Sequence, residues 1–314
     1  IPLILGYSYE GNEKQYKKIC KLFIKNLTRD SSKFCLNLKK NKLPKISFLS
    51  PDIRNHPVGF FIKDMLPELS KRFEVIIFNT SEFEDEISLY AKKFCQWINV
   101  QAKNEYEIAD IIYRKKVDVL VDSSGLTRTN NLGVFKLRPS NNQVSWAGWL
   151  ASTNLKEMDY VISDNFCTQK KDEKFFTEKI LRMKNIWCAY SLSVLENLNL
   201  KKENNSEPFI IYGCFQRPEK ITKKVLTTWV DILKRVKKSK IFFINQSFHE
   251  YERNKIIFHF NKNGVSSKRL IFIQPESRKE YLNSYNLVDI NLDTFPYNGG
   301  TTLFESSYMG VPTL

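Results

Sequence analysis

The sequence predicts an α/β protein built from two doubly wound domains of parallel strands. Short apolar runs that indicate buried strands alternate with amphipathic helical stretches along most of the chain. The alternation stops at a polar segment rich in Asn, Lys and Glu, residues 192–208, and restarts after it. A length of 314 residues and a hydrophobic content of 42% are sufficient for two cores of this kind.

The expected N-terminal domain comprises residues 44–200. Its clearest strand is KISFLS, at 45–50, and Pro57 opens the first helix, where its missing N–H costs nothing. Further strands are expected at 73–79, 117–122, 142–148 and 158–164, and helices at 56–70, 82–95 and 105–116. Residues 1–43 before this domain are expected to form a lead-in helix (11–29) and a lysine-rich linker.

The expected C-terminal domain comprises residues 205–314. Strands are expected at 209–214, 240–245, 270–273 and 287–293, and helices at 219–238, 247–263, 277–286 and from 301 onward. The last residues, GVPTL, stop where a further strand should start, and the chain does not begin with Met. We therefore expect a fragment at both ends, with an incomplete C-terminal domain.

Composition limits the classes of function. No apolar run approaches the ~20 residues of a membrane helix, and no signal peptide is evident at the N-terminus. The six cysteines are scattered without a CxxC pair, which predicts a cytoplasmic protein. With three histidines and no strand-ending DxD pair, no metal site is expected.

The net charge of +15 permits nucleic acid, an anionic surface or anionic small ligands as partners. The lysines are spread along the whole chain, and the densest basic segment, residues 223–240, has helical spacing. A solvated helix face explains that segment better than nucleic-acid binding, because no nucleic-acid motif accompanies it. The acidic run at 82–86 is likewise expected to be a solvated helix start.

The turn DTFPYNGGTTLFE, residues 293–305, is the strongest candidate site. Gly299 and Gly300 permit close approach of a ligand to the backbone, and Thr301 and Thr302 open a helix whose first N–H groups attract anions. Glu305 lies one helical turn beyond Thr301, where a carboxylate suits a ribose diol. A capped helix, with Thr301 as the cap, is the alternative, so the spacing alone leaves phosphate binding open.

Two further strand-to-helix turns carry candidate residues. Arg217 and Lys220 follow the strand at 209–214, and cations near a helix N-terminus favour a bound anion, although solvated surface cations would look the same. His56 follows the strand at 45–50 and suits proton transfer near neutral pH, although a helix cap is the simpler explanation.

Five segments together resemble the catalytic region of the O-GlcNAc transferase and SPINDLY-type glycosyltransferases, glycosyltransferase family 41, bacterial members above all. They are SPDIRNHPVG (50–59), VDVLVDSSGLT (117–127), LRPSNNQVSWAG (137–148), MDYVISD (158–164) and LDTFPYNGGTT with its following E and YMGVP (292–312). The resemblance implies a GT-B fold, two Rossmann-like domains facing a cleft, preceded by tetratricopeptide helices. It also implies inverting, metal-independent transfer of a sugar from a nucleotide-sugar donor to a protein side chain.

The resemblance assigns roles residue by residue. It implies a catalytic role for His56 and Asp110. The residues it implies for the donor are Lys220 on the diphosphate, Thr301 and Thr302 on the phosphates beside Gly299 and Gly300, Glu305 on the ribose, and Arg278 near the nucleoside. Arg217 is a further donor-binding candidate because of its place in the same turn as Lys220, and the resemblance does not assign it. The expected donor is UDP-GlcNAc and the expected acceptor a Ser or Thr of a protein, with no metal, membrane or nucleic-acid partner.

The chain departs from the family pattern at four places. GWLAST, residues 148–153, replaces the usual Gly-Tyr-Pro-Gly-Thr run. Tyr281 and Leu126 each stand where His is common, and Arg217 stands where Asn or Gln is common. A nucleotide-sugar-binding pseudoenzyme is therefore the first alternative to an active transferase. A basic nucleic-acid-binding protein is the second.

Overall fold

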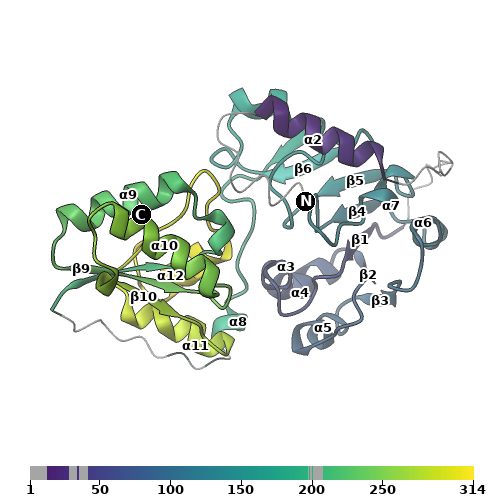
Figure 1. The fold of residues 1–314 in the computed structure, drawn as a ribbon. Helices are drawn as coiled ribbons and strands as arrows, with labels where there is room; N and C mark the ends of the chain where they lie inside the picture. The colour runs from purple at the N-terminus through teal and green to yellow at the C-terminus, as the bar shows by residue number, and fades with distance from the viewer. Residues whose placement is uncertain (1–12, 28–33, 35–41, 197, 199, 201–207) are drawn as a thin grey trace. The chain divides into compact units, whose positions relative to one another are not determined.

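The computed structural model describes residues 13–27, 34, 42–196, 198, 200 and 208–314 (Figure 1). The expected linker, apart from a few residues, and residues 201–207 of the polar boundary segment lie outside the described part. The chain divides into two compact units, and the division falls between Val194 and Leu195. Among the described residues, no helix combines the length and apolarity that crossing a bilayer requires.

The first unit is a parallel sheet of seven strands in the order β3-β2-β1-β4-β5-β6-β7. The strands are β1 (Lys45–Ser50), β2 (Glu74–Asn79), β3 (Gln96–Asn99), β4 (Val119–Asp122), β5 (Asn142–Ser145), β6 (Tyr160–Ser163) and β7 (Lys179–Arg182). The central strands are buried on both faces, as helix-covered parallel sheets require. In the register, Asp122 at the end of β4 lies opposite Leu49 on one side and Ser145 on the other.

Helices connect these strands. They are α2 (Glu13–Lys25), α3 (Pro57–Ile62), η1 (Lys63–Met65), α4 (Leu66–Ser70), α5 (Glu86–Ala91), α6 (Glu105–Arg114), α7 (Leu132–Lys136), η2 (Lys170–Phe175) and α8 (Ser193–Glu196). Asp85 and Asn104 begin α5 and α6 with capping boxes, which satisfy the first helical N–H groups. The helix expected at 82–95 is wrong at both ends. It begins only after the Asp85 cap, within the acidic run, and it ends at Ala91.

The lead-in helix α2 packs on the core of the first unit. Cys20 is fully buried in the hydrophobic cluster beneath it, and Tyr16 and Phe23 pack against the same cluster. Lys136 at the end of α7 donates a hydrogen bond to the carbonyl of Leu27, just after α2, at 3.3 Å. The described part of the lead-in is thus held by this unit.

The second unit is a parallel sheet of four strands in the order β10-β9-β8-β11. The strands are β8 (Ile210–Cys214), β9 (Ser239–Ile244), β10 (Leu270–Ile273) and β11 (Ile290–Asn291). Its helices are η3 (Pro218–Lys220), α9 (Lys223–Arg235), α10 (Glu250–Lys262), η4 (Ser267–Arg269), α11 (Arg278–Asn283), η5 (Ser284–Leu287) and α12 (Thr301–Tyr308). The expected strand at 287–293 is shorter than predicted, since only two of its residues pair.

Each sheet has one point where the direction of winding reverses. In the first unit the chain winds outward through β1, β2 and β3, and α6 then returns it to β4 on the other side of β1. In the second unit it winds outward through β8, β9 and β10, and α11 returns it to β11 beside β8. Doubly wound sheets bind ligands at the carboxyl ends of the strands that flank such a switch point. The two places to examine are therefore the ends of β1 and β4, and the ends of β8 and β11.

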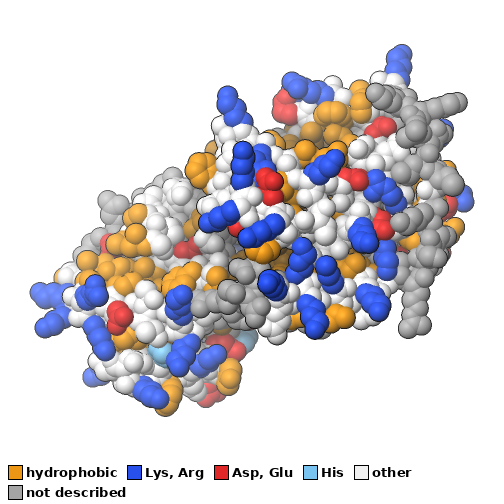
Figure 2. Space-filling view, turned by 90° about the horizontal axis from the view of Figure 1, so that it is seen from above, with side chains coloured by type: hydrophobic (Ala, Val, Ile, Leu, Met, Phe, Trp, Pro, Cys, Tyr) orange, Lys and Arg blue, Asp and Glu red, His pale blue; other side chains and the backbone are white. Residues whose placement is uncertain are grey.

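Lys and Arg side chains do not form one continuous patch on the face shown in Figure 2, where they are interspersed with hydrophobic and acidic side chains. The basic segment at 223–240 contains α9, whose apolar face packs in the core of the second unit through Leu226 and Trp229. The interpretation as an amphipathic helix is confirmed for Lys223–Arg235, whereas Ser239 and Lys240 begin β9.

Candidate active site

Gln216, which sequence reasoning did not single out, joins the loops at the switch point of the second unit. It lies two residues after the end of β8 and is 2% exposed. Its amide nitrogen donates to Asp293 Oδ1 at 2.9 Å and to Thr302 Oγ1 at 2.8 Å, while its amide oxygen accepts from Lys220 Nζ at 3.0 Å. The end of β8, the loop after β11 and the start of α12 are therefore held by one side chain.

Asp293 folds the loop that follows β11. It accepts hydrogen bonds from the backbone N–H groups of Thr294 (2.8 Å) and Gly299 (2.9 Å). Burial raises the pKa of the Asp293 carboxyl, and these N–H groups and nearby Lys220 oppose the rise. A Cβ on Gly299 would lie 2.1 Å from Thr302 Oγ1, so only glycine fits there. The sequence predicted that Gly299 permits close approach of a ligand, and the structure shows that packing within the loop also requires a glycine there.

Lys220 is the cation of this cluster. Its Nζ donates to the carbonyl of Asn298 at 3.1 Å and lies 4.8 Å from the centre of the Tyr297 ring. Burial lowers the pKa of Lys220 to about 8, and the charge of Asp293 limits the decrease. An anion placed beside Lys220 would restore its preference for the charged form, because an opposite charge nearby favours ionisation.

The first turn of α12 faces the same cluster and suits an anion. Gly300 occupies the N-cap position without a side-chain cap, and the first turn contains no acidic residue. Thr301 is already helical, so the alternative in which Thr301 caps the helix is wrong. Uncapped N–H groups and the helix dipole together attract negative charge. Lys220, Thr302 and this helix end are brought together as the sequence predicted.

Arg278 and Glu305 form an ion pair beside this cluster. Arg278 Nη2 lies 2.7 Å from Glu305 Oε1, and the Glu305 side chain is 2% exposed. Glu305 thus already has a charged partner, while Arg278 remains 23% exposed. The assignment of Glu305 to a ribose stays a prediction, and this geometry gives it the additional role of orienting Arg278.

An aromatic wall stands behind the ion pair. The Phe215 and Tyr285 rings stack with centroids 3.6 Å apart, and Tyr281 meets Phe215 edge-on. Tyr285 donates through its hydroxyl to the carbonyl of Thr302 at 3.2 Å. Burial, with the nearby Glu305 charge, holds the pKa of Tyr281 well above its usual value. Tyr281 is therefore a neutral phenol at physiological pH, in the position where histidine is common in the family.

His56 lies at the switch point of the first unit and caps α3. Its Nδ1 accepts from the Val58 N–H at 3.3 Å, and Asp52 Oδ2 lies 3.8 Å from the same nitrogen. A neutral imidazole that accepts at Nδ1 carries its proton on Nε2, so this form is a hydrogen-bond donor there. To accept a proton at Nε2, a neutral His56 must carry its own proton on Nδ1. It then gives up the hydrogen bond from the Val58 N–H and donates from Nδ1 toward Asp52 instead. Its side chain is 38% exposed.

The loops after β4 and β5 form the other side of this switch point. Asp122 is fully buried and accepts from the N–H groups of Ser124 and Gly125, while burial raises its pKa to about 6. A Cβ on Gly148 would lie 1.8 Å from the Ser123 carbonyl oxygen, so the two loops touch through their backbones. In the described part of the chain, Ser123 Oγ, Ser124 Oγ and Trp149 Nε1 are buried without a hydrogen-bond partner.

The unusual segment 148–153 is anchored by a buried carboxylate. Ser152 Oγ donates to Glu178 Oε2 at 2.7 Å, and the Thr153 N–H and hydroxyl donate to Oε1. The polar side chains of this segment are thus bound to Glu178. The segment is a fixed wall, unlike a loop of free hydroxyls.

Asp110 has different surroundings from His56. It lies midway along α6, the helix that returns the chain to β4, and pairs with Arg114 one turn later at 2.9 Å. His56, in contrast, lies at the carboxyl edge of the sheet. The catalytic assignment of Asp110 stays a prediction.

Among the described residues, no group of three or more His, Cys, Asp or Glu side chains is placed to hold a metal ion.

Comparison with known proteins decides the family. The model of glycosyl transferase family 41 matches residues 10–207 and 199–314. This chain belongs to that family. The SPINDLY protein of Arabidopsis thaliana, named as a probable UDP-N-acetylglucosamine–peptide N-acetylglucosaminyltransferase, is 31% identical over 88% of this chain. The SEC protein of the same plant, which carries the same probable activity in its name, is 25% identical over 86%.

The solved structures agree on the fold. An O-GlcNAc transferase of Thermobaculum terrenum superposes with a TM-score of 0.89 at 24% identity, over 99% of this chain and 60% of that one. The lipopolysaccharide galactosyltransferase WaaB superposes with a TM-score of 0.55 at 14% identity, over 86% of this chain and 79% of that one. The family 41 chain therefore has the GT-B fold that the sequence predicted. It spans 31% of the length of the Arabidopsis SPINDLY protein.

Proposed function

We propose that this chain forms the sugar-transfer region of a glycosyltransferase that moves GlcNAc from UDP-GlcNAc to a protein side chain, a Ser or Thr hydroxyl. The names of its family 41 relatives supply the donor and the peptide acceptor. Inversion, independence of a metal and the choice of Ser or Thr are parts of the proposal that rest on the family resemblance.

The cluster of Lys220, Gln216 and the start of α12 carries the proposal. A departing UDP bears negative charge on its phosphates, and Lys220 with the uncapped N–H groups of α12 can stabilise it. Gln216 fixes Thr302 and Lys220 relative to each other before the donor binds, so little reorganisation is required. Arg278 lies on the adjoining helix α11, where a nucleoside attached to those phosphates would extend.

On the other unit, His56 is the group proposed to touch the reacting atoms. With its proton on Nε2 it donates a hydrogen bond to the substrate, and with its proton on Nδ1 toward Asp52 it accepts one. Either role requires an imidazole, so His56→Ala should lower transfer far more than donor binding. Equal turnover by the variant and the parent would exclude His56 from the reaction.

The test is donor binding followed by transfer in the full-length protein. We expect UDP and UDP-GlcNAc to raise the melting temperature more than GDP, GDP-fucose or UMP at equal concentration. Radiolabelled UDP-GlcNAc should then label a protein acceptor mixture, with label released by β-elimination if the acceptor is Ser or Thr. Stabilisation by none of these nucleotides would contradict the assignment of the donor site to the cluster of Lys220, Gln216 and the start of α12.

Two observations favour a pseudoenzyme as the second candidate. Ser152 and Thr153 of the altered segment are bound to Glu178, and Tyr281, whose pKa is raised well above its usual value, replaces a common histidine. Binding of UDP-GlcNAc without transfer to any acceptor would favour this candidate. Restoring the family run Gly-Tyr-Pro-Gly-Thr at the altered segment, with gain of transfer, would identify the segment as the cause.

A further inference from the structure

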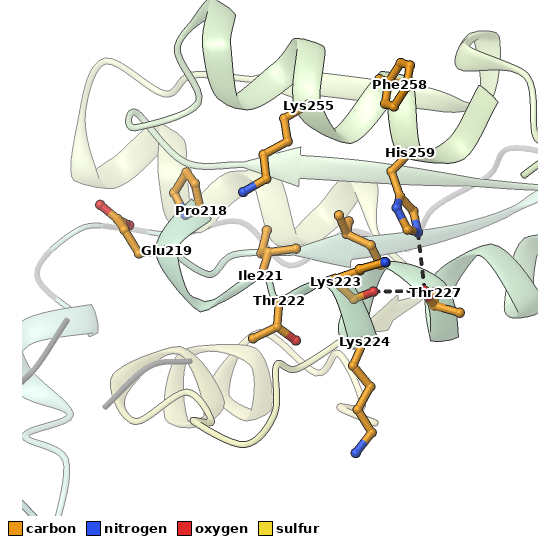
Figure 3. A pocket seen from close by; sticks show the side chains of 11 residues that line it. Pro218, Glu219, Ile221, Thr222, Lys223, Lys224, Thr227, Lys255, Phe258 and His259 are labelled. Carbon is orange, nitrogen blue, oxygen red and sulfur yellow. Dashed lines mark hydrogen bonds between the residues drawn. The ribbon is translucent and has the colours of Figure 1, made fainter. Parts of the chain in front are cut away.

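A hollow lies in the same unit next to the cluster of Lys220, Gln216 and Asp293, and two of its lining residues, Glu219 and Ile221, flank Lys220 in the sequence. Its volume is about 830 Å³, and it lies between α10 on one side and η3 with the start of α9 on the other. Figure 3 shows Lys255 and His259 reaching from α10 toward Pro218, Thr222 and Thr227. The contact between His259 Nε2 and Thr227 Oγ1, at 3.4 Å, ties the two helices together at one end.

The lining is basic at the rim and apolar at the floor. Lys223, Lys224 and Lys255 are exposed, and Glu219 is the single acidic side chain among the lining residues. Ile221 and Leu226 are buried beneath them. Phe258 stands at the edge with 68% of its surface exposed. The ring is accessible to a partner that enters the groove, and aromatic side chains are enriched in protein–protein interfaces.

The start of α9 concentrates the positive charge. Lys223 and Lys224 are its first two residues, and its first turn contains no acidic side chain. Cations at this end of a helix oppose the dipole, so the arrangement is unfavourable in isolation and favourable beside an anion. The charges of Lys223 and Lys262, after burial itself, also lower the pKa of His259. Among its lining residues, the hollow thus has three lysines and one carboxylate, Glu219.

We propose that this groove docks an acidic peptide segment of a protein partner, with an apolar side chain on the floor and carboxylates against the lysines. The volume is in the range of ligand pockets, roughly 300–1,000 Å³, and leaves room for more than one side chain of a peptide. The apolar floor and Glu219 disfavour a nucleic-acid backbone, which requires a continuous basic track. The proposal does not depend on the transferase activity, because the groove shares no residue with the Lys220–Gln216–Asp293 cluster.

The probe is a short fluorescein-labelled peptide of glutamates with two central phenylalanines, measured by fluorescence anisotropy with the full chain. The double reversal Lys223→Glu with Lys255→Glu should weaken binding about tenfold or more at low salt, since two attractive rim charges become repulsive. The matched control reverses Lys170 and Lys171, exposed residues of η2 in the first unit, and makes the same change in net charge. The control should bind as the parent does.

Phe258→Ser provides an independent variant, because a residue this exposed can be replaced without unfolding the chain. It should weaken the peptide about threefold to tenfold through lost apolar contact. Circular dichroism and thermal unfolding check that both groove variants stay folded. Equal losses in the control, unchanged binding in the groove variants, or tighter binding of a DNA duplex that displaces the peptide would each overturn the proposal.

Discussion

The two switch points of this molecule have the same strand topology but differ in how far their polar side chains are hydrogen-bonded. At the ends of β8 and β11, Gln216, Asp293 and Lys220 are linked to one another by hydrogen bonds before any ligand arrives. At the ends of β1 and β4, buried Ser123 and Ser124 hydroxyls have no partner in the described part of the chain. The first arrangement is preorganised, whereas the second is incomplete.

The difference fits two kinds of substrate contact. A diphosphate is a fixed shape with strong charge, so a rigid cluster of donors binds it with little entropic cost. Each unsatisfied buried polar group costs roughly 1–3 kcal/mol, so the unpaired hydroxyls of Ser123 and Ser124 are expected to bind something. Under the proposed function, the cluster in the second unit would supply affinity for the diphosphate, and the hydroxyls in the first unit would complete their hydrogen bonds with another part of a substrate.

The largest expected effect is a loss of stability confined to the first unit. Gly148→Ala places a methyl group 1.8 Å from the carbonyl oxygen of Ser123. Because this contact involves backbone atoms, one of the two loops must shift. We expect a loss of about 3–5 kcal/mol of unfolding free energy in the first unit, with calorimetric UDP binding by the second unit retained. Denaturant unfolding that is unchanged in this variant would show that the two loops do not touch as described.

The next effect tests the preorganised side. Asp293→Ala removes the acceptor for Gly299, Thr294 and Gln216, which leaves buried donors unpaired. We expect roughly 2–3 kcal/mol of destabilisation and a loss of UDP affinity of about a hundredfold. Asp293→Asn is the control, since its amide oxygen still accepts from these groups and most of the affinity should survive. If both variants bind UDP equally well, the loop does not build the site.

Lys220 gives a smaller and pH-dependent effect. Lys220→Ala should weaken UDP by ~1–3 kcal/mol, the usual contribution of a charge-assisted hydrogen bond. Lys237→Ala, an exposed lysine of the same unit, is the matched control. Unchanged calorimetric affinity in Lys220→Ala would remove this residue from the diphosphate site.

The pH profile sharpens the same assignment. Burial sets the pKa of Lys220 at about 8 in the free protein, below its usual 10.5. Binding an anion favours the protonated amine, so UDP affinity should be constant between about pH 7 and 8, above the phosphate pKa of about 6. It should fall above pH 8, by at most about tenfold per pH unit. Lys220→Arg should abolish the fall, because the guanidinium stays charged. A flat profile in the parent would contradict the assignment.

Much of the fold follows from local pattern. The strand expected at 45–50 coincides with β1, and that at 270–273 with β10, because a short run of buried apolar residues is a strong signal. The sequence did not reveal β3 and β7. Both are four-residue edge strands with exposed side chains, QWIN and KILR, so neither has an apolar run.

The candidate site was predictable only in part. Lys220 and Thr302 were found because charge and hydroxyls at a strand-to-helix turn indicate an anion site. Gln216 was missed, since a glutamine carries no signal until the loops it bonds are known to meet. The Arg278–Glu305 ion pair joins residues 27 positions apart, and spacing along one helix cannot predict it. These are contacts of the tertiary fold, which local sequence does not encode.

The smallest expected effect discriminates most sharply between a helix end and a phosphate site. Gly300 has a φ of −109°, outside the left-handed region that favours glycine, and a Cβ there would meet nothing within 4 Å. Gly300→Ala should therefore leave the unfolding free energy within about 0.5 kcal/mol of the parent, as for an ordinary surface change. The same methyl group would stand where a phosphate must approach the N–H groups of α12, so UDP affinity should fall about threefold to tenfold. A variant with unchanged affinity would mean that the open space at Gly300 is a bare helix end, and the anion would then have to bind through Lys220 alone.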